Sequence, residues 1–286
     1  MKYIFIAANV GEFRISRMCR VLGVQRSSYY AWQRRSPSSR AQANAALLAR
    51  IQAEHAASRQ TYGAPRIQVV LQRQGVVCGH NRVARLMRKA GLRALAPRKA
   101  HPVTTQRQPG TVPAPNRLNQ EFTATAPNQK WVVDFTYIQT EEGWLYLAVV
   151  LDLFSRKVIG WAMRETMDTA LVLAALHMAL LERQPPAGLL HHSDQGSQYT
   201  ATAYLEYLTA AAAQLSMSGV GNCYDNAVVE SFFGTLKTEC VTGPFRTRAQ
   251  ARTTIFEYLE VWYNRQRLHS SLGYYSPVDF ECQFTL

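Results

Sequence analysis

The chain has 286 residues, of which 47% are hydrophobic and 18% are charged, and its formal net charge is +13. These values suit a soluble globular protein with room for more than one domain, and no apolar run approaches the ~20 residues that a membrane-spanning helix needs. The five cysteines form no Cys-x-x-Cys pair, so we expect reduced thiols in the cytoplasm and no disulfide framework.

The excess of positive over negative charge lies in the first third of the chain. Residues 1–100 contain 19 lysines and arginines but only two acidic residues, Glu12 and Glu54, whereas residues 101–286 carry a small net negative charge. Most of the cations are arginines, which can make bidentate contacts to phosphate and to guanine. A strongly basic segment joined to a nearly neutral one predicts nucleic acid as the partner.

Residues 13–35 have the pattern of two short helices around a turn, which is typical of a helix-turn-helix unit. Met18, Val21 and Leu22 are expected to form its small core. The alternative is a helical hairpin with a solvated basic face. In the DNA-binding hypothesis, side chains on the second helix contact DNA: Arg26, Ser28, Tyr30, Arg34 and Arg35.

A second helix-turn-helix pattern follows. One helix is predicted over 41–58, another begins at Pro65, which suits a first turn, and a third runs from Asn81 to a stop at Gly91. An ordinary charged outer face would explain the cations of the third helix but not the scarcity of acids around them. We expect the basic residues of this helix to follow one DNA backbone: Arg82, Arg85, Arg88 and Lys89.

Six prolines between residues 97 and 127 interrupt any periodic pattern, so this stretch is predicted to be an extended linker. Strands are then expected at 131–138, 144–152 and 157–163, the first two joined by a hairpin turn. The remaining elements are predicted in this order: helix 169–183, strand 188–192, helix 202–212, strand 214–217, a mobile loop at 219–222, a helix around Glu230, and helix 246–263.

Three acidic residues stand where a charge is costly unless it is paired or bound to a metal. Asp134 lies within an apolar strand, Asp194 follows a short buried strand, and Glu230 lies beside the apolar face of a helix. Carboxylates from two strands and a helix would suit Mg²⁺, which prefers oxygen ligands and keeps several waters. Each acid also has an ordinary explanation: a salt bridge for Asp134, turn chemistry for Asp194, and solvent exposure for Glu230.

Other candidate site residues lie close to these acids in the sequence. Asp152, at the end of the second strand, is expected to be structural, and Asp225 with Asn226 to cap the Glu230 helix. A zinc site built from His191, His192 and Cys223 is a further alternative, but the spacing matches no common zinc pattern.

The end of the chain combines tyrosines with basic residues. These side chains suit base stacking and phosphate binding, although a helix packed on the core with a solvated end explains them equally well. The DNA contacts expected in this tail are Arg265, Arg267 and His269. Two further contacts are expected elsewhere: Lys237 on the Glu230 helix, and Arg66 in the second helical unit.

The residues around the three acids carry a family resemblance. Residues 193–199 (Ser-Asp-Gln-Gly-Ser-Gln-Tyr) and 222–239 (Asn-Cys-Tyr-Asp-Asn-Ala-x-x-Glu-Ser-Phe-Phe-x-x-Leu-Lys-x-Glu) resemble the DDE transposases of insertion sequences, whose catalytic core is similar to that of retroviral integrase. Tyr-Gly-x-x-Arg-Ile at 62–67 and Tyr-Asn-x-x-Arg-x-His at 263–269 are similar to signatures before and after that core.

The resemblance implies an α+β multidomain protein: helix-turn-helix units followed by a ribonuclease-H-like core with a five-stranded mixed sheet flanked by helices. The expected divisions are a helix-turn-helix at 1–39, a second one at 40–98, a proline-rich linker at 99–127, the integrase-like catalytic core at 128–241, and a C-terminal helix with a basic, aromatic tail at 242–286.

The resemblance also implies a function, that of a DDE-type polynucleotidyl transferase. Asp134, Asp194 and Glu230 would hold two Mg²⁺ or Mn²⁺ ions, nick the ends of an insertion sequence and transfer the freed 3′-hydroxyl by direct transesterification. The implied partners are double-stranded DNA, at the ends of the element and at the target site, and further copies of the chain bound to that DNA. An upstream-frame protein is a third implied partner, because the chain resembles a downstream-frame product and lacks the sustained heptads of a coiled coil. The expected place of action is the nucleoid in a bacterial cytoplasm.

Two alternative functions stay open at this point. The first alternative is a DNA-binding regulator with a non-catalytic core. The second is a ribonuclease-H-like nuclease that cuts without strand transfer. The presence of all three acids argues against the first, and the two DNA-reading patterns argue against the second.

Overall fold

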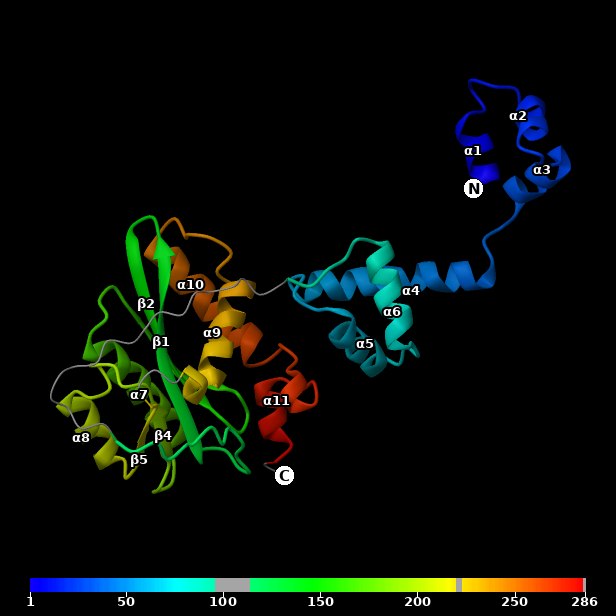
Figure 1. Ribbon diagram of the computed structural model, residues 1–286. Coiled ribbons are helices and arrows are strands. Elements are labelled where there is room, and N and C mark those ends of the chain that lie inside the picture. The colour runs from blue at the N-terminus through cyan, green and yellow to red at the C-terminus, as the bar shows by residue number, and fades with distance from the viewer. Residues whose placement is uncertain (96–113, 220–222, 285–286) are drawn as a thin grey trace.

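The computed structural model describes residues 1–95, 114–219 and 223–284. The loop predicted at 219–222, apart from Gly219, and most of the predicted linker lie outside these residues. Figure 1 shows a small helical unit at the N-terminus, a second helical unit, and a larger mixed core. Throughout the described ranges, each helix is too short or too polar to cross a bilayer.

The first unit contains the two predicted helices and one that the sequence analysis missed. Its core combines Ile6, Met18, Cys19 and Tyr29. The prediction of Val21 in this core is wrong, since its side chain is 78% exposed; the unpredicted first helix supplies Ile6, which packs in the same cluster as Cys19. The helices are α1 (Lys2–Ala8), α2 (Ile15–Val21) and α3 (Arg26–Arg34).

The second unit consists of three mutually packed helices, as the sequence predicts. They are α4 (Ser39–Ala57), α5 (Ala64–Arg73) and α6 (His80–Lys89). The Ser38 hydroxyl caps α4 by accepting a hydrogen bond from the Ala41 amide at 3.2 Å, and Pro65 occupies the first turn of α5. Ile51, Ile67 and Val83, one from each helix, are completely buried at the centre of the unit.

The core is a five-stranded mixed sheet with strand order β3-β2-β1-β4-β5. β1 pairs antiparallel with β2 and parallel with β4, and these pairings place β1 at the centre. β3 extends the hairpin, and β5 lies parallel to β4. The strands are β1 (Lys130–Thr140), β2 (Gly143–Asp152), β3 (Val158–Arg164), β4 (Leu190–Ser193) and β5 (Gln214–Met217).

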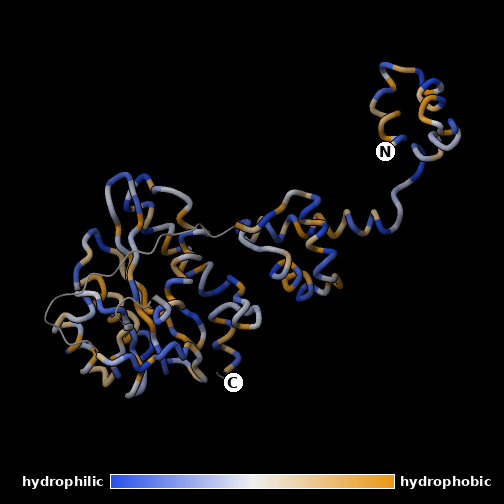
Figure 2. The backbone as a smooth tube through the Cα atoms, viewed as in Figure 1, coloured by the Kyte–Doolittle hydropathy of each residue, from blue (hydrophilic) through white to orange (hydrophobic). Residues whose placement is uncertain are grey.

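Helices cover both faces of this sheet because side chains alternate along β1. Val133 packs with α7 (Thr169–Arg183) and α8 (Thr202–Ala210), whereas Val132 packs in the cluster that contains α9 (Ala227–Glu239) and α10 (Arg248–Glu257). In Figure 2 the hydrophobic residues gather along these strands. The arrangement confirms the ribonuclease-H-like fold that the resemblance implies.

The described end of the predicted linker lies on the core instead of extending freely. Leu118 is buried, and the amides of Arg117 and Leu118 donate to the Ser216 hydroxyl on β5 at 2.9 and 3.1 Å. Proline content alone could not reveal this contact, because it joins residues about 100 positions apart in the sequence.

Asp152 has the structural role expected of it. Its fully buried carboxylate accepts hydrogen bonds from the amides of Asn128 and Phe154, both at 2.8 Å, and lies 3.5 Å from Arg183. It therefore ties the entry to β1 to the end of β2.

After α9 the chain returns over the same face of the sheet. The single helix predicted over 246–263 is α10 followed by a π-helix, η2 (Tyr258–Tyr263). Two short helices beyond it were not predicted, and a further 3₁₀ turn precedes α9. These are η3 (Ser270–Leu272), α11 (Pro277–Cys282) and η1 (Cys223–Asn226).

Gly160 on β3 allows α7 to approach the sheet closely. A Cβ atom there would lie 2.3 Å from the Ala175 carbonyl oxygen and 2.7 Å from the Ala179 Cβ. We expect Gly160→Ala to lower the free energy of unfolding by about 1–3 kcal/mol, as overpacking does. Gly234→Ala, in open space within α9, should raise it by about 0.5–1 kcal/mol. Thermal unfolding of both variants checks this, and equal effects would contradict the close approach.

Candidate active site and DNA-binding surface

The pairing of β1 with β4 brings two aspartates to one place in the sheet. Val132 on β1 pairs with His192 on β4, and extending this parallel register by two residues sets Asp134 level with Asp194. Neighbouring strands lie about 4.8 Å apart, so the two carboxylates leave the sheet side by side. Asp194 is the first residue after β4.

The pKa of Asp134 shows which charged groups surround it. Burial raises this pKa well above the ordinary value, and the negative charges of Asp194 and then Glu230 raise it further. The Phe135 amide, which donates to the Asp134 Oδ1 at 2.7 Å, acts in the opposite direction, as does the positive charge of Lys237. Asp194, Glu230 and Lys237 therefore all act electrostatically on Asp134.

Asp194 also makes the turn that its neighbours predict. Its Oδ1 accepts a hydrogen bond from the Gly196 amide at 3.0 Å. Tyr199, at the end of the same motif, was not among the predicted site residues. Burial raises its pKa well above the ordinary value, and the charges of Asp134 and Asp194 add to this shift. Its buried hydroxyl has no hydrogen-bond partner among the described residues. Only its place in the motif could have pointed to it.

Glu230 reaches the same region from a helix. It lies in the first turn of α9, and its side chain is exposed, although partial burial raises its pKa. Phe232 and Leu236 are buried in the cluster that holds α9 against the sheet. Lys237, two turns after Glu230, places its Nζ atom 4.7 Å from the centre of the Tyr137 ring on β1.

The chemistry of these side chains suits a hard divalent cation. Asp134 and Asp194 form a fixed pair of oxygen donors, and a bound cation would reverse the repulsion that raises the pKa of Asp134. Among the described residues, no three His, Cys, Asp or Glu side chains already lie close enough to hold a metal ion. The exposed Glu230 would have to approach the aspartate pair to complete such a site.

The side chains of His191 and His192 make hydrogen bonds inside the core. The Nε2 atom of His191 lies 3.1 Å from the Tyr204 hydroxyl, and His192 contacts the Ser216 and Ser218 hydroxyls at 2.8 and 3.1 Å. Burial lowers the pKa of His191 to about 3 and that of His192 to about 4, so both are neutral at pH 7. These partners leave the zinc alternative without support; the side chain of Cys223 lies outside the described residues.

The prediction that Asp225 and Asn226 cap the Glu230 helix is wrong for Asn226, whose side chain makes no capping hydrogen bond. The buried Asp225 carboxylate instead accepts hydrogen bonds from the side chains of Asn116 and Gln120, at 2.9 and 3.0 Å, and from the Gly219 amide at 2.9 Å. It thereby ties the end of the predicted linker to the segment that enters α9. Asn116 and Gln120 are 109 and 105 residues from Asp225 in the sequence, so no local pattern could indicate these two partners.

Most of the DNA contacts predicted in the first 100 residues are accessible. Arg26, Ser28, Arg34 and Arg35 are exposed on or beside α3, and Tyr30 is half-buried. On α6, Arg85, Arg88 and Lys89 are exposed and Arg82 is half-buried.

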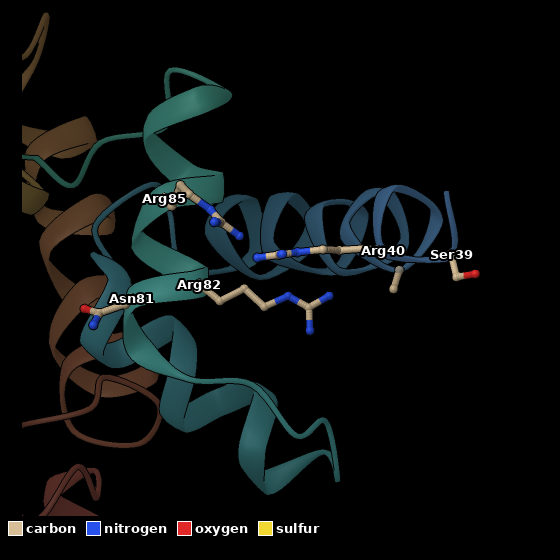
Figure 3. Close-up of a pocket in the computed structure, with 6 residues that line it drawn as sticks. Ser39, Arg40, Asn81, Arg82 and Arg85 are labelled. Atoms are coloured by element: carbon tan, nitrogen blue, oxygen red, sulfur yellow. The ribbon is translucent and has the colours of Figure 1, made fainter. Parts of the chain in front are cut away.

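A groove between α4 and α6 gathers three arginines. Arg40, from α4, and Arg82 and Arg85, from α6, line it together with Ser39, Ala43 and Asn81. Figure 3 shows the three guanidinium groups extending into the same space. The Arg82 Nε donates to the Asn44 Oδ1 at 2.9 Å, which orients that side chain. Arg40 was not predicted, because α4 showed no basic stripe.

The predicted DNA contacts in the C-terminal tail, together with Arg66 on α5, differ in how accessible their side chains are. Arg265 is exposed, and its Nε donates to the Glu260 carbonyl at 3.1 Å. Arg267 and His269 are buried, and Arg66 is half-buried with its Nε donating to the Leu268 carbonyl at 2.9 Å. To contact DNA, these three side chains would have to leave the protein partners that they have in this structure.

Comparison with known proteins agrees with this arrangement. Two models described as "Integrase core domain" match residues 124–223 and 211–277, and one described as "HTH-like domain" matches residues 42–100. The transposase InsF for insertion sequence IS3A of Escherichia coli (strain K12) is 47% identical over 284 residues, which cover 98% of each chain.

One further relative and one solved structure also match the chain. An uncharacterized 31 kDa protein of insertion element IS600 from Shigella sonnei is 47% identical over 264 residues, covering 92% of this chain and 97% of that protein. A chain in the cryo-EM structure of the simian T-cell lymphotropic virus intasome, in complex with PP2A regulatory subunit B56 gamma, is 16% identical. It has a TM-score of 0.48 and covers 75% of this chain and 70% of that one.

The raised pKa of Asp134 predicts a pH-dependent effect on stability. The folded protein binds this proton more tightly than the unfolded chain does, so stability falls as pH rises from the ordinary carboxyl range, about 4, through the raised pKa. In metal-free buffer we expect Asp134→Asn to melt a few degrees above wild type at pH 7.5, with the difference disappearing near pH 4. Calorimetry across this range checks it, and a variant less stable than wild type at pH 7.5 would contradict it.

Proposed function

The chain belongs to the insertion-sequence transposases that carry an integrase core domain, and on this basis we propose that Asp134, Asp194 and Glu230 are its catalytic acids. It is a DNA transposase, a polynucleotidyl transferase of the DDE type. The observation that carries the proposal is the β1–β4 register, which continues to set Asp134 beside Asp194; burial and the charges of Asp194 and Glu230 accordingly raise the pKa of Asp134. Such a costly concentration of negative charge has no structural benefit in a sheet.

The three carboxylates would hold divalent cations, Mg²⁺ or Mn²⁺, two for each site. Bound there, the ions would activate the attacking oxygen and stabilise the leaving oxygen at one phosphorus. Asp134 and Asp194 provide the rigid part of the site, because Asp134 lies on β1 and Asp194 directly follows β4 in a hydrogen-bonded turn. Glu230 provides the adjustable part from the first turn of α9. Lys237, which lowers the pKa of Asp134 from the same helix, offers a positive charge to a DNA phosphate.

Two successive reactions at phosphorus follow from this site. Water first attacks the phosphodiester at an end of the element, and the bond to the 3′-oxygen breaks to leave a 3′-hydroxyl. That hydroxyl then attacks a second phosphodiester, so one P–O bond forms as another breaks. Because the attacking oxygen belongs to water or DNA in both steps, no serine or tyrosine nucleophile is needed.

DNA is held by the two helical units that precede the core. The α3 residues Arg26, Ser28, Tyr30, Arg34 and Arg35 suit one part of the duplex. The three arginines of the α4–α6 groove, with Arg88 and Lys89, suit the phosphates of another. Because an element has two ends, we propose that several copies of the chain assemble on DNA at the bacterial nucleoid, together with an upstream-frame protein.

A test of the catalytic acids compares strand joining by two matched variants. Wild type with Mg²⁺ should join a labelled element end to target DNA, and chelation of the metal should stop the reaction. Glu230→Gln should reduce joining by about 10²–10³-fold, since a metal ligand contributes several kcal/mol to the transition state. Glu206→Gln, the same change on the exposed surface of α8, should join at the wild-type rate.

Other results of this assay point to other functions. Joining that survives in Glu230→Gln would refute the site assignment. Cleavage by wild type without any joined product would favour a nuclease, and binding without cleavage would favour a regulator.

The α4–α6 groove makes a separate prediction about affinity. Arg85→Ala should weaken binding to all DNA sequences alike and reduce the salt dependence of the binding constant by about one ion, as the loss of one phosphate contact does. Arg164→Ala on β3 is the control, because Arg164 already pairs with Asp168 at 3.4 Å. The measurement is the DNA-binding constant of both variants at several salt concentrations. If the slope of this constant against salt is unchanged in Arg85→Ala, the groove does not contact DNA.

A further inference from the structure

Two sequence signatures with no role in the chemistry above meet in the structure. Tyr62-Gly-x-x-Arg66 lies at the start of α5, in the second helical unit, and Arg267 and Leu268 lie after η2, in the C-terminal part of the core. The Tyr62 hydroxyl accepts a hydrogen bond from the Leu268 amide at 2.7 Å, and the Arg66 Nε donates to the Leu268 carbonyl at 2.9 Å. The two side chains thus bind both backbone polar groups of one distant residue, Leu268.

The neighbouring Arg267 makes a buried ion pair with the last residue of α9. Its Nη2 atom lies 2.7 Å from the Glu239 Oε1, and the two side chains are only 8% and 7% exposed. The Arg267 Nε donates to both Glu239 oxygens, at 3.0 and 2.9 Å. Burial disfavours the charged guanidinium, but these hydrogen bonds outweigh it and raise the pKa of Arg267.

Glu239 also binds two aromatic side chains of the π-helix η2. The Tyr258 hydroxyl donates to its Oε2 at 3.0 Å, and the Trp262 indole N–H donates to the same atom at 3.3 Å. The Trp262 ring in turn lies 5.7 Å from the Tyr62 ring. Glu239 is thus connected to the second helical unit through one layer of side chains.

Contacts at the edge of the junction reinforce it. The Arg59 Nη2 pairs with the Glu257 Oε1 at 2.7 Å, and its guanidinium lies 5.4 Å from the Trp262 ring centre. Arg73 donates to the Tyr274 carbonyl at 2.9 Å and lies 4.7 Å from the Tyr275 ring centre. Arg59 and Arg73 of the basic first third therefore contact the C-terminal part of the core in this structure.

We propose that this junction is a latch that sets the position of α9, and with it Glu230, relative to the helical unit that grips DNA. Tyr62, Arg66, Arg267 and Glu239 are its positioning residues. Glu239 and Glu230 lie on one rigid helix, about 14 Å apart along its axis at 1.5 Å per residue. A duplex held in the α4–α6 groove is consequently presented to the acids at a fixed offset, which selects the phosphodiester that is cut. This inference rests on the proposed function.

A latch and a DNA contact predict opposite changes in DNA affinity and in the rate of cleavage. Arg66→Lys keeps the positive charge but loses the planar Nε donor, and Tyr62→Phe loses only the hydroxyl. With the full chain and labelled end DNA, a latch predicts unchanged affinity for both variants. The rate of cleavage at saturating DNA should fall about 10–100-fold, as expected when a reacting group is misplaced, and the cuts should spread to neighbouring positions. A phosphate contact by Arg66 predicts weaker binding with an unchanged rate and cutting position.

Tyr146→Phe on β2, which removes a hydroxyl outside the junction, is the matched control. Hydrogen exchange of α9 supplies a second readout that needs no catalysis. Faster exchange over residues 227–239 in Tyr62→Phe than in Tyr146→Phe supports the latch. Equal exchange, or equal rates and cutting positions in the two variants, overturns it. If wild type fails to cleave, the proposed function fails, and the exchange result alone decides the latch.

Discussion

The parallel pairing of β1 with β4 is the constraint on which the rest of the structure depends. Its register, continued by two residues, sets Asp134 on β1 level with Asp194, the first residue after β4, and burial and repulsion raise the pKa of Asp134. Two aspartates on flexible loops would separate to relieve this repulsion. Here Asp134 lies on the central strand and Asp194 directly follows the neighbouring strand in a hydrogen-bonded turn, so the protein keeps a concentrated negative charge that a divalent cation would neutralise.

The third acid is supplied differently, and this difference explains much of the remaining fold. Glu230 stands on a helix whose two ends are held by distant parts of the chain. Near its beginning, Asp225 binds Asn116 and Gln120 of the segment that leads into the core. At its end, Glu239 binds Arg267, within the junction to the second helical unit. The segment that leads into the core and the C-terminal part of the core thereby hold the helix that carries Glu230.

Much of this arrangement could be predicted from sequence, for reasons that are local. Apolar runs bounded by turn residues indicated the strands, helical spacing indicated α7 to α9, and the long motifs around Asp194 and Glu230 pointed to the acids. What local patterns could not indicate depends on contacts between distant residues. Arg66, Arg267 and His269 look like DNA-binding side chains in a basic, aromatic sequence, yet they have partners inside the protein. Arg40 and Tyr199 were missed because only the fold brings Arg40 to α6 and Tyr199 to the acids.

The central claim is that Asp134, Asp194 and Glu230 share divalent cations at the site of phosphoryl transfer. Anomalous diffraction from crystals of the protein bound to its end DNA and soaked in Mn²⁺ tests it most directly. We predict two manganese peaks about 4 Å apart, ligated by the aspartate pair, with Glu230 drawn in to complete the site. Manganese bound elsewhere, or an aspartate pair that stays metal-free in the presence of DNA, would contradict the account.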